Sequence, residues 1–243
     1  MSSYNIEISD AKDFAPVIAD EVVLSICEAV EERGVCNLVL AGGATPSGIY
    51  RLFSRPPRVA DIPWDKVRIF WGDERWVSKE DSQSNYRMAQ ETFLSQVPIK
   101  ESALFPIDTT LPSAEAAAQA YHQTLKAELA ASGGVFDLVL LGLGEDGHTA
   151  SLFPGTSWDT PQQDLALAVK HPENGGWRVS ISMSALKAAR KVIFIVKGEG
   201  KAEALAQVIE KNAVALPAQQ FLDLGERLTW FVDSAAAVKL KKH

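Results

Sequence analysis

The sequence predicts a three-layer α/β fold built on a mostly parallel central sheet. Four short runs rich in Val, Ile and Leu are apolar on both faces, which is typical of parallel strands covered on each side. Helix-length segments separate these runs, so strands alternate with helices as in βαβ units. With 47% hydrophobic and 23% charged residues, the chain also has the composition of a folded globular protein.

The individual elements follow from local patterns along the chain. A long amphipathic helix is expected over residues 10–34, because apolar residues recur there at helical spacing between a Ser-Asp start signal and a terminal Gly. The strand-like runs cover residues 36–41, 67–71, 135–141 and 192–196. Further helices are expected over residues 84–96, 113–132 and 199–211.

The connections between these elements favour one domain. Three Pro-containing stretches are expected to be loops, and none is long or polar enough for an interdomain linker; they cover residues 55–63, 97–112 and 154–161. A chain of 243 residues fits one large α/β domain. We therefore predict a single domain over residues 1–243, with a division at Gly133 and Gly134 as the alternative.

Charge and hydropathy patterning narrow the range of partners. Lys and Arg number 24 against 31 Asp and Glu, a net charge of −7, so the chain repels polyanions and no nucleic-acid partner is expected. An anionic ligand must instead meet positive charge assembled locally. The sequence has no run of roughly 18 apolar residues and no signal-peptide pattern, so we expect no membrane partner. Together with only two cysteines, this predicts a cytoplasmic location.

Metal and cofactor sites are not indicated by the sequence. No HxxxH pair and no CxxC spacing occurs, and the histidines are scattered along the chain, at His122, His148, His171 and His243. We therefore expect chemistry without a protein-bound metal and without a cofactor. The sequence leaves the oligomeric state open between a monomer and a small homo-oligomer.

The first polar strand ending is a diglycine turn. Ligands of open parallel sheets bind beyond the carboxyl ends of the strands, so the residues after each run are the informative ones. Gly42 and Gly43 let backbone N–H groups approach an anion, and Thr45 and Ser47 add hydroxyl donors at an expected helix start. The turn lacks the Walker A and GxGxxG patterns. Local sequence supports a phosphate cradle and a purely structural turn equally.

The second strand ending concentrates charge. Asp73, Glu74 and Arg75 follow the run at 67–71, and such residues are rarely buried without partners. A solvated loop with an internal Asp–Arg pair is the structural alternative. The position at the carboxyl end of a strand, beside other polar endings, favours a functional role.

The third strand ending carries an imidazole. Three glycines within residues 142–147 allow a crowded turn, in which Asp146 and His148 can both face the opening. An imidazole with an ordinary pKa of about 6.5 is largely neutral at pH 7 and can accept a proton, while a nearby carboxylate orients it. This context favours catalysis over a structural histidine. Ser151 as a nucleophile activated by His148 ranks lower, because the GxSxG pattern is absent.

With these endings in view, the chain resembles the 6-phosphogluconolactonase family, within a larger group that includes glucosamine-6-phosphate deaminases. The matching segments are LAGGATP at 40–46, WGDERWV at 71–77, SNY at 84–86 and GLGEDGHTASLFP at 142–154. The resemblance implies a Rossmann-like fold and hydrolysis of 6-phospho-D-glucono-1,5-lactone to 6-phosphogluconate in the pentose phosphate pathway. The expected partner is therefore a small sugar-phosphate lactone.

The resemblance also implies roles for particular residues. His148 corresponds to the general base that activates water, with Asp146 beside it. Arg75, with Asp73, corresponds to a polar group beside the sugar ring, and Arg75 or backbone N–H groups would stabilise the oxyanion.

Two further cations resemble phosphate contacts of the larger group. Arg178 begins a strand-like run, and Lys201 lies near a helix start after a Gly-rich turn, so both are expected to reach the diglycine turn. The alternative is that both are surface cations paired with nearby Glu residues.

Two other functions stay open as alternatives. The deaminases have a Glu five residues after the active-site His, whereas this chain has Phe153 there, which favours lactone hydrolysis. A non-catalytic sugar-phosphate binding module is the other alternative. The Asp146–His148 turn argues against it, because phosphate binding needs no base.

Trp71 and Trp76 flank the second ending and fit core packing better than a sugar-stacking wall.

Overall fold

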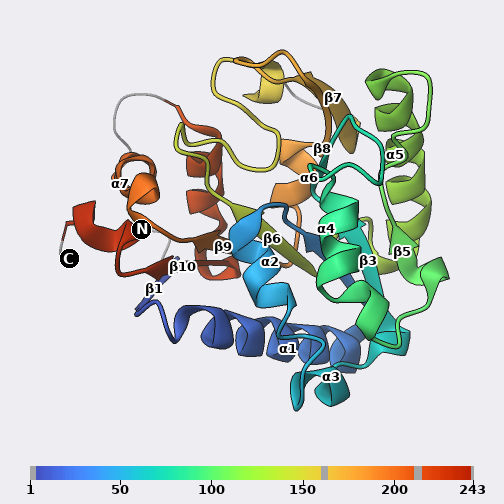
Figure 1. The fold of residues 1–243 in the computed structure, drawn as a ribbon, viewed down its shortest axis with the longest axis horizontal. Coiled ribbons are helices and arrows are strands. Elements are labelled where there is room, and N and C mark those ends of the chain that lie inside the picture. The colour runs from blue at the N-terminus through green and yellow to red at the C-terminus, as the bar shows by residue number, and fades with distance from the viewer. Residues whose placement is uncertain (1–3, 160–163, 211–214, 242–243) are drawn as a thin grey trace.

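The computed structural model describes residues 4–159, 164–210 and 215–241, and within them the chain builds a seven-stranded parallel sheet (Figure 1). The strand order is β1-β10-β9-β6-β2-β3-β5. The strands are β1 Asn5–Ser9, β2 Cys36–Leu40, β3 Val67–Trp71, β5 Leu104–Phe105, β6 Leu138–Gly142, β9 Lys191–Val196 and β10 Leu228–Asp233. Every pairing in this sheet is parallel, which confirms the predicted fold class.

Helices flank the sheet, as Figure 1 shows. They are α1 Phe14–Arg33, α2 Ala44–Tyr50, α3 Arg58–Asp61, α4 Asn85–Thr92, α5 Ala114–Leu129, α6 Met183–Lys187 and α7 Ala202–Ile209. Short 3₁₀ segments cover Trp64–Lys66, Leu94–Gln96, Glu101–Ala103, Ala130–Ser132, Ser157–Asp159, Glu199–Lys201, Pro217–Arg227 and Ala236–Lys239. Among the described residues, we find no helix with the length and apolar character needed to cross a bilayer.

The helix boundaries have local causes that the sequence carries. Gly34 ends α1 in the left-handed region at φ 75°, where glycine has no steric penalty. Ser84 and Ser113 precede α4 and α5, and each side chain accepts a hydrogen bond from a backbone N–H in the first turn. The predicted helices at 84–96 and 113–132 are therefore correct in place, although their last residues form 3₁₀ turns.

The four predicted strands are adjacent at the centre of the sheet, as β9-β6-β2-β3. The structure adds strands at both edges and a second, antiparallel sheet of order β4-β8-β7. Its strands are β4 Asp73–Arg75, β8 Trp177–Ile181 and β7 Ala166–Lys170. All three segments expected as loops contain short elements. Helix α3 lies within 55–63, β5 within 97–112, and the 3₁₀ segment Ser157–Asp159 within 154–161. Residues 160–161 and 211 of the expected elements lie outside the described residues.

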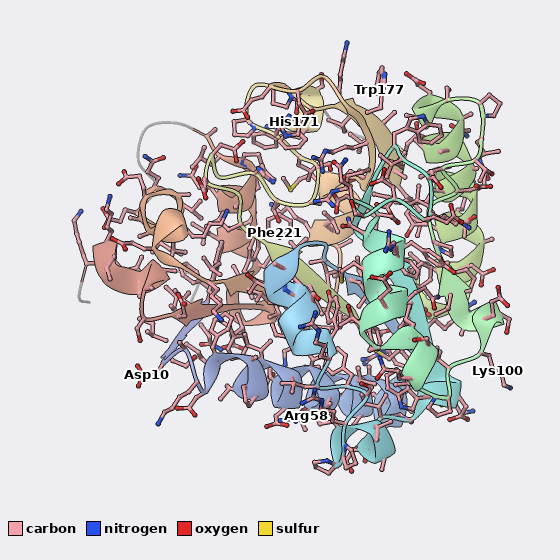
Figure 2. The ribbon with its side chains drawn as sticks, viewed as in Figure 1. Asp10, Arg58, Lys100, His171, Trp177 and Phe221 are labelled. Carbon is pink, nitrogen blue, oxygen red and sulfur yellow. The ribbon has the colours of Figure 1, made fainter. Side chains whose placement is uncertain are left out.

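Different helices pack against the two sheets, and the strand order marks where a ligand would bind. Helix α1 packs against β2 and β10, whereas α5 packs against β7 and β8 (Figure 1). Trp177 of the small sheet reaches the surface (Figure 2). The order of the central strands reverses between β2 and β6, which is where parallel α/β sheets bind ligands. The one-domain organisation stays a prediction, supported by a hydrophobic core that continues on both sides of Gly133.

Candidate active site

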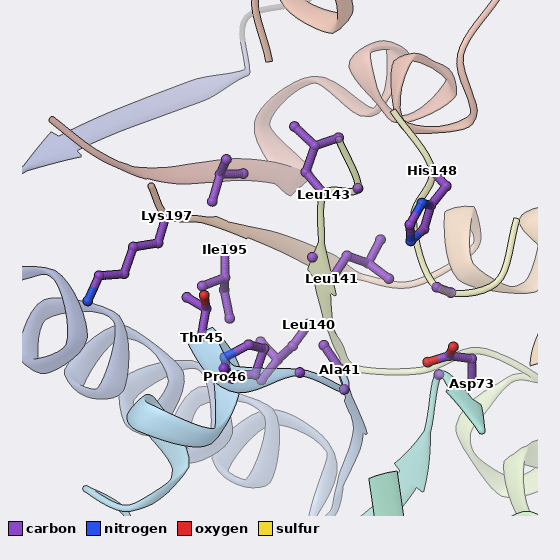
Figure 3. Close-up of a pocket in the computed structure, with 18 of the residues that line it drawn as sticks. Ala41, Thr45, Pro46, Asp73, Leu140, Leu141, Leu143, His148, Ile195 and Lys197 are labelled. Carbon is purple, nitrogen blue, oxygen red and sulfur yellow. The ribbon is translucent and has the colours of Figure 1, made fainter. Parts of the chain in front are cut away.

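A cavity of about 310 Å³ opens at the carboxyl ends of the central strands (Figure 3). It is lined by most of the residues that the sequence singled out, namely Gly42, Gly43, Thr45, Asp73, Arg75, His148, Arg178 and Lys201. Thr45, Asp73 and His148 approach this space from three different elements in Figure 3. The three strand endings therefore converge on one cavity.

The imidazole of His148 is held by Asp146. Its Nδ1 lies 2.6 Å from Oδ1 of Asp146, and its backbone N–H also donates to that oxygen. Partial burial alone would raise the pKa of Asp146, but these hydrogen bonds lower it to about 2. Because the carboxylate is ionised and can only accept, Nδ1 carries the imidazole proton. Nε2 is then the nitrogen that carries the lone pair. Asp146 orients the imidazole through Nδ1 and does not itself line the cavity.

The backbone of this turn explains its glycines. A Cβ at Gly144 would collide with Nδ1 of His148, so the imidazole packs directly on the Gly144 α-carbon. Gly147 has φ 83°, and a Cβ there would lie 2.8 Å from Cδ1 of Leu216. Ala150, in the same turn, has φ 48°, which is uncommon for a residue with a Cβ. The turn is thus crowded and conformationally constrained around the imidazole of His148.

The diglycine turn is also tightly packed. Gly43 has φ 102°, and a Cβ at Gly42 would collide with the side chain of Asn85. Thr45 lines the cavity, as predicted. Ser47, predicted as a second hydroxyl donor, is not brought to the cavity: its buried hydroxyl lies 3.4 Å from that of Thr92 in α4 and does not line the cavity. The helical turn of α2 rotates Ser47 away from the face that carries Thr45.

Glu74 has a structural task at the second strand ending. Its buried carboxylate accepts the backbone N–H groups of Asn85 and Tyr86 and the hydroxyl of Ser84, at the start of α4. Burial raises the pKa of Glu74, and the backbone hydrogen bonds partly oppose that shift. The carboxylate therefore caps α4 and fixes this helix to the sheet.

Asp73 joins the strand endings to one another. Its carboxylate accepts from the Ser151 hydroxyl at 2.6 Å and from Asn85 Nδ2 at 3.2 Å, and it also lines the cavity. Ser151 follows the His148 turn, and Asn85 packs on Gly42. The fully buried Ser151 hydroxyl is thus engaged by Asp73 and does not line the cavity, which overturns the nucleophile alternative.

Two arginines face each other in the small sheet. Arg75 and Arg178 are direct partners in the antiparallel register of β4 and β8. Nη1 of Arg75 donates to the carbonyl of Gln83 at 2.6 Å, while its buried Nε has no hydrogen-bond partner among the described residues. Burial lowers the pKa of Arg178, and the carboxylate of Asp73 opposes that shift. Like charges opposite each other are destabilising, so an anion would stabilise this pair.

Two lysines also line the cavity. Lys201 Nζ lies 3.8 Å from Oε1 of Glu145, an exposed carboxylate, so the expected alternative of a Glu-paired surface cation holds in part. Lys197, labelled in Figure 3, is the other lining lysine. Its ammonium lies 5.9 Å from the ring centre of Phe14. Lys197 is not among the residues predicted for the site, although it directly follows the strand run at 192–196.

The flanking tryptophans are placed as expected. Trp71 is buried and packs on Tyr86, and neither it nor Trp76 lines the cavity. In the described ranges of the chain, no cluster of three or more His, Cys, Asp or Glu side chains is arranged to hold a metal. Metal-free chemistry stays a prediction.

The fold and site together define a class, an α/β protein that places an imidazole–carboxylate pair beside cations at the carboxyl edge of a parallel sheet. The chain belongs to the glucosamine-6-phosphate isomerase/6-phosphogluconolactonase family, whose pattern matches residues 9–230.

Named relatives and a solved structure agree with this assignment. A 6-phosphogluconolactonase of Synechocystis is 37% identical over 225 residues, which cover 90% of this chain and 91% of that protein. The 6-phosphogluconolactonase 3, chloroplastic, of Arabidopsis thaliana is 34% identical and shares 98% of this chain and 74% of its own length. The structure of 6-phosphogluconolactonase from Trypanosoma brucei has a TM-score of 0.84, with 27% identity, and covers 99% of this chain and 100% of its own.

Proposed function

We propose that this chain hydrolyses 6-phospho-D-glucono-1,5-lactone to 6-phospho-D-gluconate, in the oxidative branch of the pentose phosphate pathway and without a metal or cofactor. Membership of the family and the names of the relatives support the reaction. The observation that carries the proposal is one cavity that contains both a carboxylate-held imidazole and a group of cations.

The base in this proposal is His148. With Nδ1–H donated to Asp146, Nε2 takes a proton from the water molecule whose oxygen bonds to C1 of the lactone. The tetrahedral intermediate then breaks the C1–O bond of the ring, and the imidazolium returns its proton to the departing ring oxygen. A six-membered lactone has a strained, electrophilic ester, so positioned base catalysis worth ~10²–10⁴-fold gives a useful acceleration.

The cations hold the substrate and the developing charge. The phosphate binds at the backbone N–H groups of the Gly42–Gly43 turn and at Thr45, with Arg178 and Lys201 supplying positive charge. Arg75, or backbone N–H groups, stabilises the oxyanion, a contribution of ~10²–10³-fold for one donor. Asp73 lies beside the sugar ring and holds the surrounding turns in place. The remote phosphate provides binding energy that orients C1.

The decisive experiment follows lactone decay by NMR at mildly acidic pH, where the spontaneous reaction is slow. The wild-type protein should accelerate decay, and His148→Ala should not. His122→Ala is the matched control, because Nδ1 of His122 accepts the backbone N–H of Leu165 and the residue does not line the cavity. Decay at the spontaneous rate with folded wild-type protein would overturn the proposal.

The same preparation distinguishes the two alternatives. Release of ammonia from glucosamine 6-phosphate would indicate a deaminase, although the position of the relay carboxylate holds Phe153. Tight binding of a sugar phosphate without turnover would indicate a binding module.

Two broader expectations stay part of the proposal. We expect a cytoplasmic location, as the free thiols of Cys27 and Cys36 suggest. The chloroplast address in the name of one relative makes cell fractionation the necessary test. We also expect a monomer or a small homo-oligomer, which sedimentation would determine.

A further inference from the structure

The ring of Phe153 lies against two imidazoles. Its centre is 4.7 Å from that of His148 and 4.6 Å from that of His171, with interplanar angles of 50° and 58°. Phe153 is 1% exposed, so its ring is enclosed by protein. It does not line the cavity and therefore contacts the base rather than a ligand.

The contact with Phe153 completes the support of the His148 ring. The hydrogen bond to Asp146 fixes Nδ1, and the α-carbon of Gly144 supports the ring beside that nitrogen. A single hydrogen bond still allows the imidazole to pivot, and the His148 side chain is 32% exposed, so burial alone does not fix it. A flat, enclosed ring on another side restricts this pivot and fixes the direction of Nε2.

Phe153 also contacts a second histidine, which is itself held in place. Nδ1 of His171 accepts the backbone N–H groups of Glu173 and Asn174, at 3.2 Å and 3.4 Å, so the β7–β8 connection fixes its ring. His171 lies near Trp177 of β8 at the top of Figure 2, and it does not line the cavity. The guanidinium of Arg178 lies 5.8 Å from the Phe153 ring centre, a cation–π contact. The small sheet thus holds the Phe153 ring, against which the imidazole of His148 packs.

We propose that Phe153 is a positioning residue for His148, and that His171 acts through Phe153 by holding its ring in place. The inference rests on the proposed function, because the base must be aimed at a water molecule. It assigns a task to the position where the deaminases carry a carboxylate, and to a second histidine that the proposed reaction does not use.

Kinetics provide the first test. Phe153→Leu keeps an apolar side chain but removes the flat ring, and should lower kcat at least tenfold with KM within twofold, because small misplacements of a catalytic group are costly. His171→Ala should lower kcat about threefold. The double variant should be no slower than Phe153→Leu alone, since His171 acts through that ring. Phe136→Leu is the matched control, because Phe136 is equally buried but precedes β6 at the opposite edge of the sheet.

The second test needs no substrate. Long-range ¹⁵N–¹H correlations of the carbon-bound ring protons report the tautomer of His148, with His148→Ala giving the assignment. Wild type and Phe136→Leu should hold the Nδ1–H tautomer, whereas Phe153→Leu and His171→Ala should shift toward a mixture. If wild type lacks lactonase activity, the proposed function fails while this measurement still decides the positioning role.

Three results would overturn the proposal: a kcat within twofold of wild type in Phe153→Leu, an unchanged tautomer in that variant, or kcat losses that multiply in the double variant. Should Phe153→Leu fail to fold, His171→Ala alone decides, and an unchanged kcat and tautomer in that variant would sink the idea.

Discussion

The central strands carry one polar cluster where they begin, at the amino edge of the sheet, and another where they end, at the carboxyl edge. The two clusters differ in how completely their charged groups are paired. At the amino edge, Asp137 precedes β6, and its side chain is 1% exposed. Its carboxylate accepts from Nε of Arg33 at 2.7 Å and from the backbone N–H of Asn37 at 2.8 Å, and Arg190 lies 3.4 Å away. This buried charge is surrounded by donors.

At the carboxyl edge the pairing is incomplete. Arg75 and Arg178 face each other, and the buried Nε of Arg75 has no protein partner within the described ranges. The hydrogen bond between His148 and Asp146 engages Nδ1 and leaves Nε2 outside that contact. At the amino edge the charge of Asp137 is paired, although the buried Oδ1 of Asn37 has no hydrogen-bond partner among the described residues. A cluster whose charge is paired contributes to the fold, whereas one that leaves cations and an imidazole facing a cavity is prepared for a ligand.

The largest expected effect separates catalysis from stability at the carboxyl edge. His148→Ala should lower kcat ~10³-fold, about 4 kcal/mol of transition-state stabilisation, because no other imidazole of the described residues lines the cavity. The partly exposed side chain should change the free energy of unfolding by less than about 0.5 kcal/mol. Steady-state kinetics and urea denaturation on one preparation measure both. Near-normal kcat in the folded variant would remove His148 from its role.

The converse is expected at the amino edge. Asp137→Ala should lower the free energy of unfolding by about 3 kcal/mol, because it leaves the Asn37 N–H and two arginines without their acceptor. The kcat should stay within twofold of wild type. Asp223→Ala is the control, since its exposed pair with Lys187 should be worth less than about 1 kcal/mol. An Asp137→Ala variant with unchanged stability and lost activity would contradict the assignment of a structural role to the amino edge.

Much of the difference between the two edges can be predicted from the sequence, because the residues that directly follow each apolar strand run must lie at the carboxyl edge. The four central strands are continuous apolar runs, and each is followed directly by the residues that line the cavity. Lys197 follows the same rule and could have been found by it. Gly144 and Gly147 were also predictable, since a crowded turn around an imidazole needs positions without a Cβ.

Other features depend on tertiary pairing that no local pattern contains. β4 is a strand only because it pairs with β8, more than a hundred residues later in the chain. Asp73 and Glu74 are adjacent carboxylates, yet one lines the cavity and the other caps α4. Thr45 and Ser47 are both hydroxyls two positions apart, and only the direction of α2 separates their environments.

A smaller effect is expected for substrate binding. Arg178→Met should raise KM for the phosphorylated lactone about tenfold, roughly 1.4 kcal/mol, because a charge-assisted contact to phosphate is lost. KM for unphosphorylated gluconolactone should not change. Arg190→Met, at the amino edge, is the matched control and should leave both values unaltered. Equal changes toward the two lactones would place Arg178 outside the phosphate site.

The smallest effect concerns the pH dependence of stability at Asp146. Hydrogen bonds from His148 lower the pKa of this carboxyl from 3.8 to about 2 in the folded protein, against the opposing effect of partial burial. A carboxyl with a lowered pKa stabilises the fold above its unfolded-state pKa, and this contribution disappears as the pH falls through the folded-state value. Wild type should therefore be slightly more stable than Asp146→Asn at pH 6, and the gap should close as pH falls below about 4.

Urea denaturation of both proteins between pH 6 and pH 3 measures that gap. It should be small, because the Asp146 side chain is 48% exposed and solvent screens the interaction. In a His148→Ala background the gap should shrink at every pH, since the main donor to the carboxylate is gone. A gap that widens with acidification would mean that the carboxylate is strained rather than stabilised by the imidazole. The carboxyl edge would then lack the carboxylate-held imidazole that sets it apart from the amino edge.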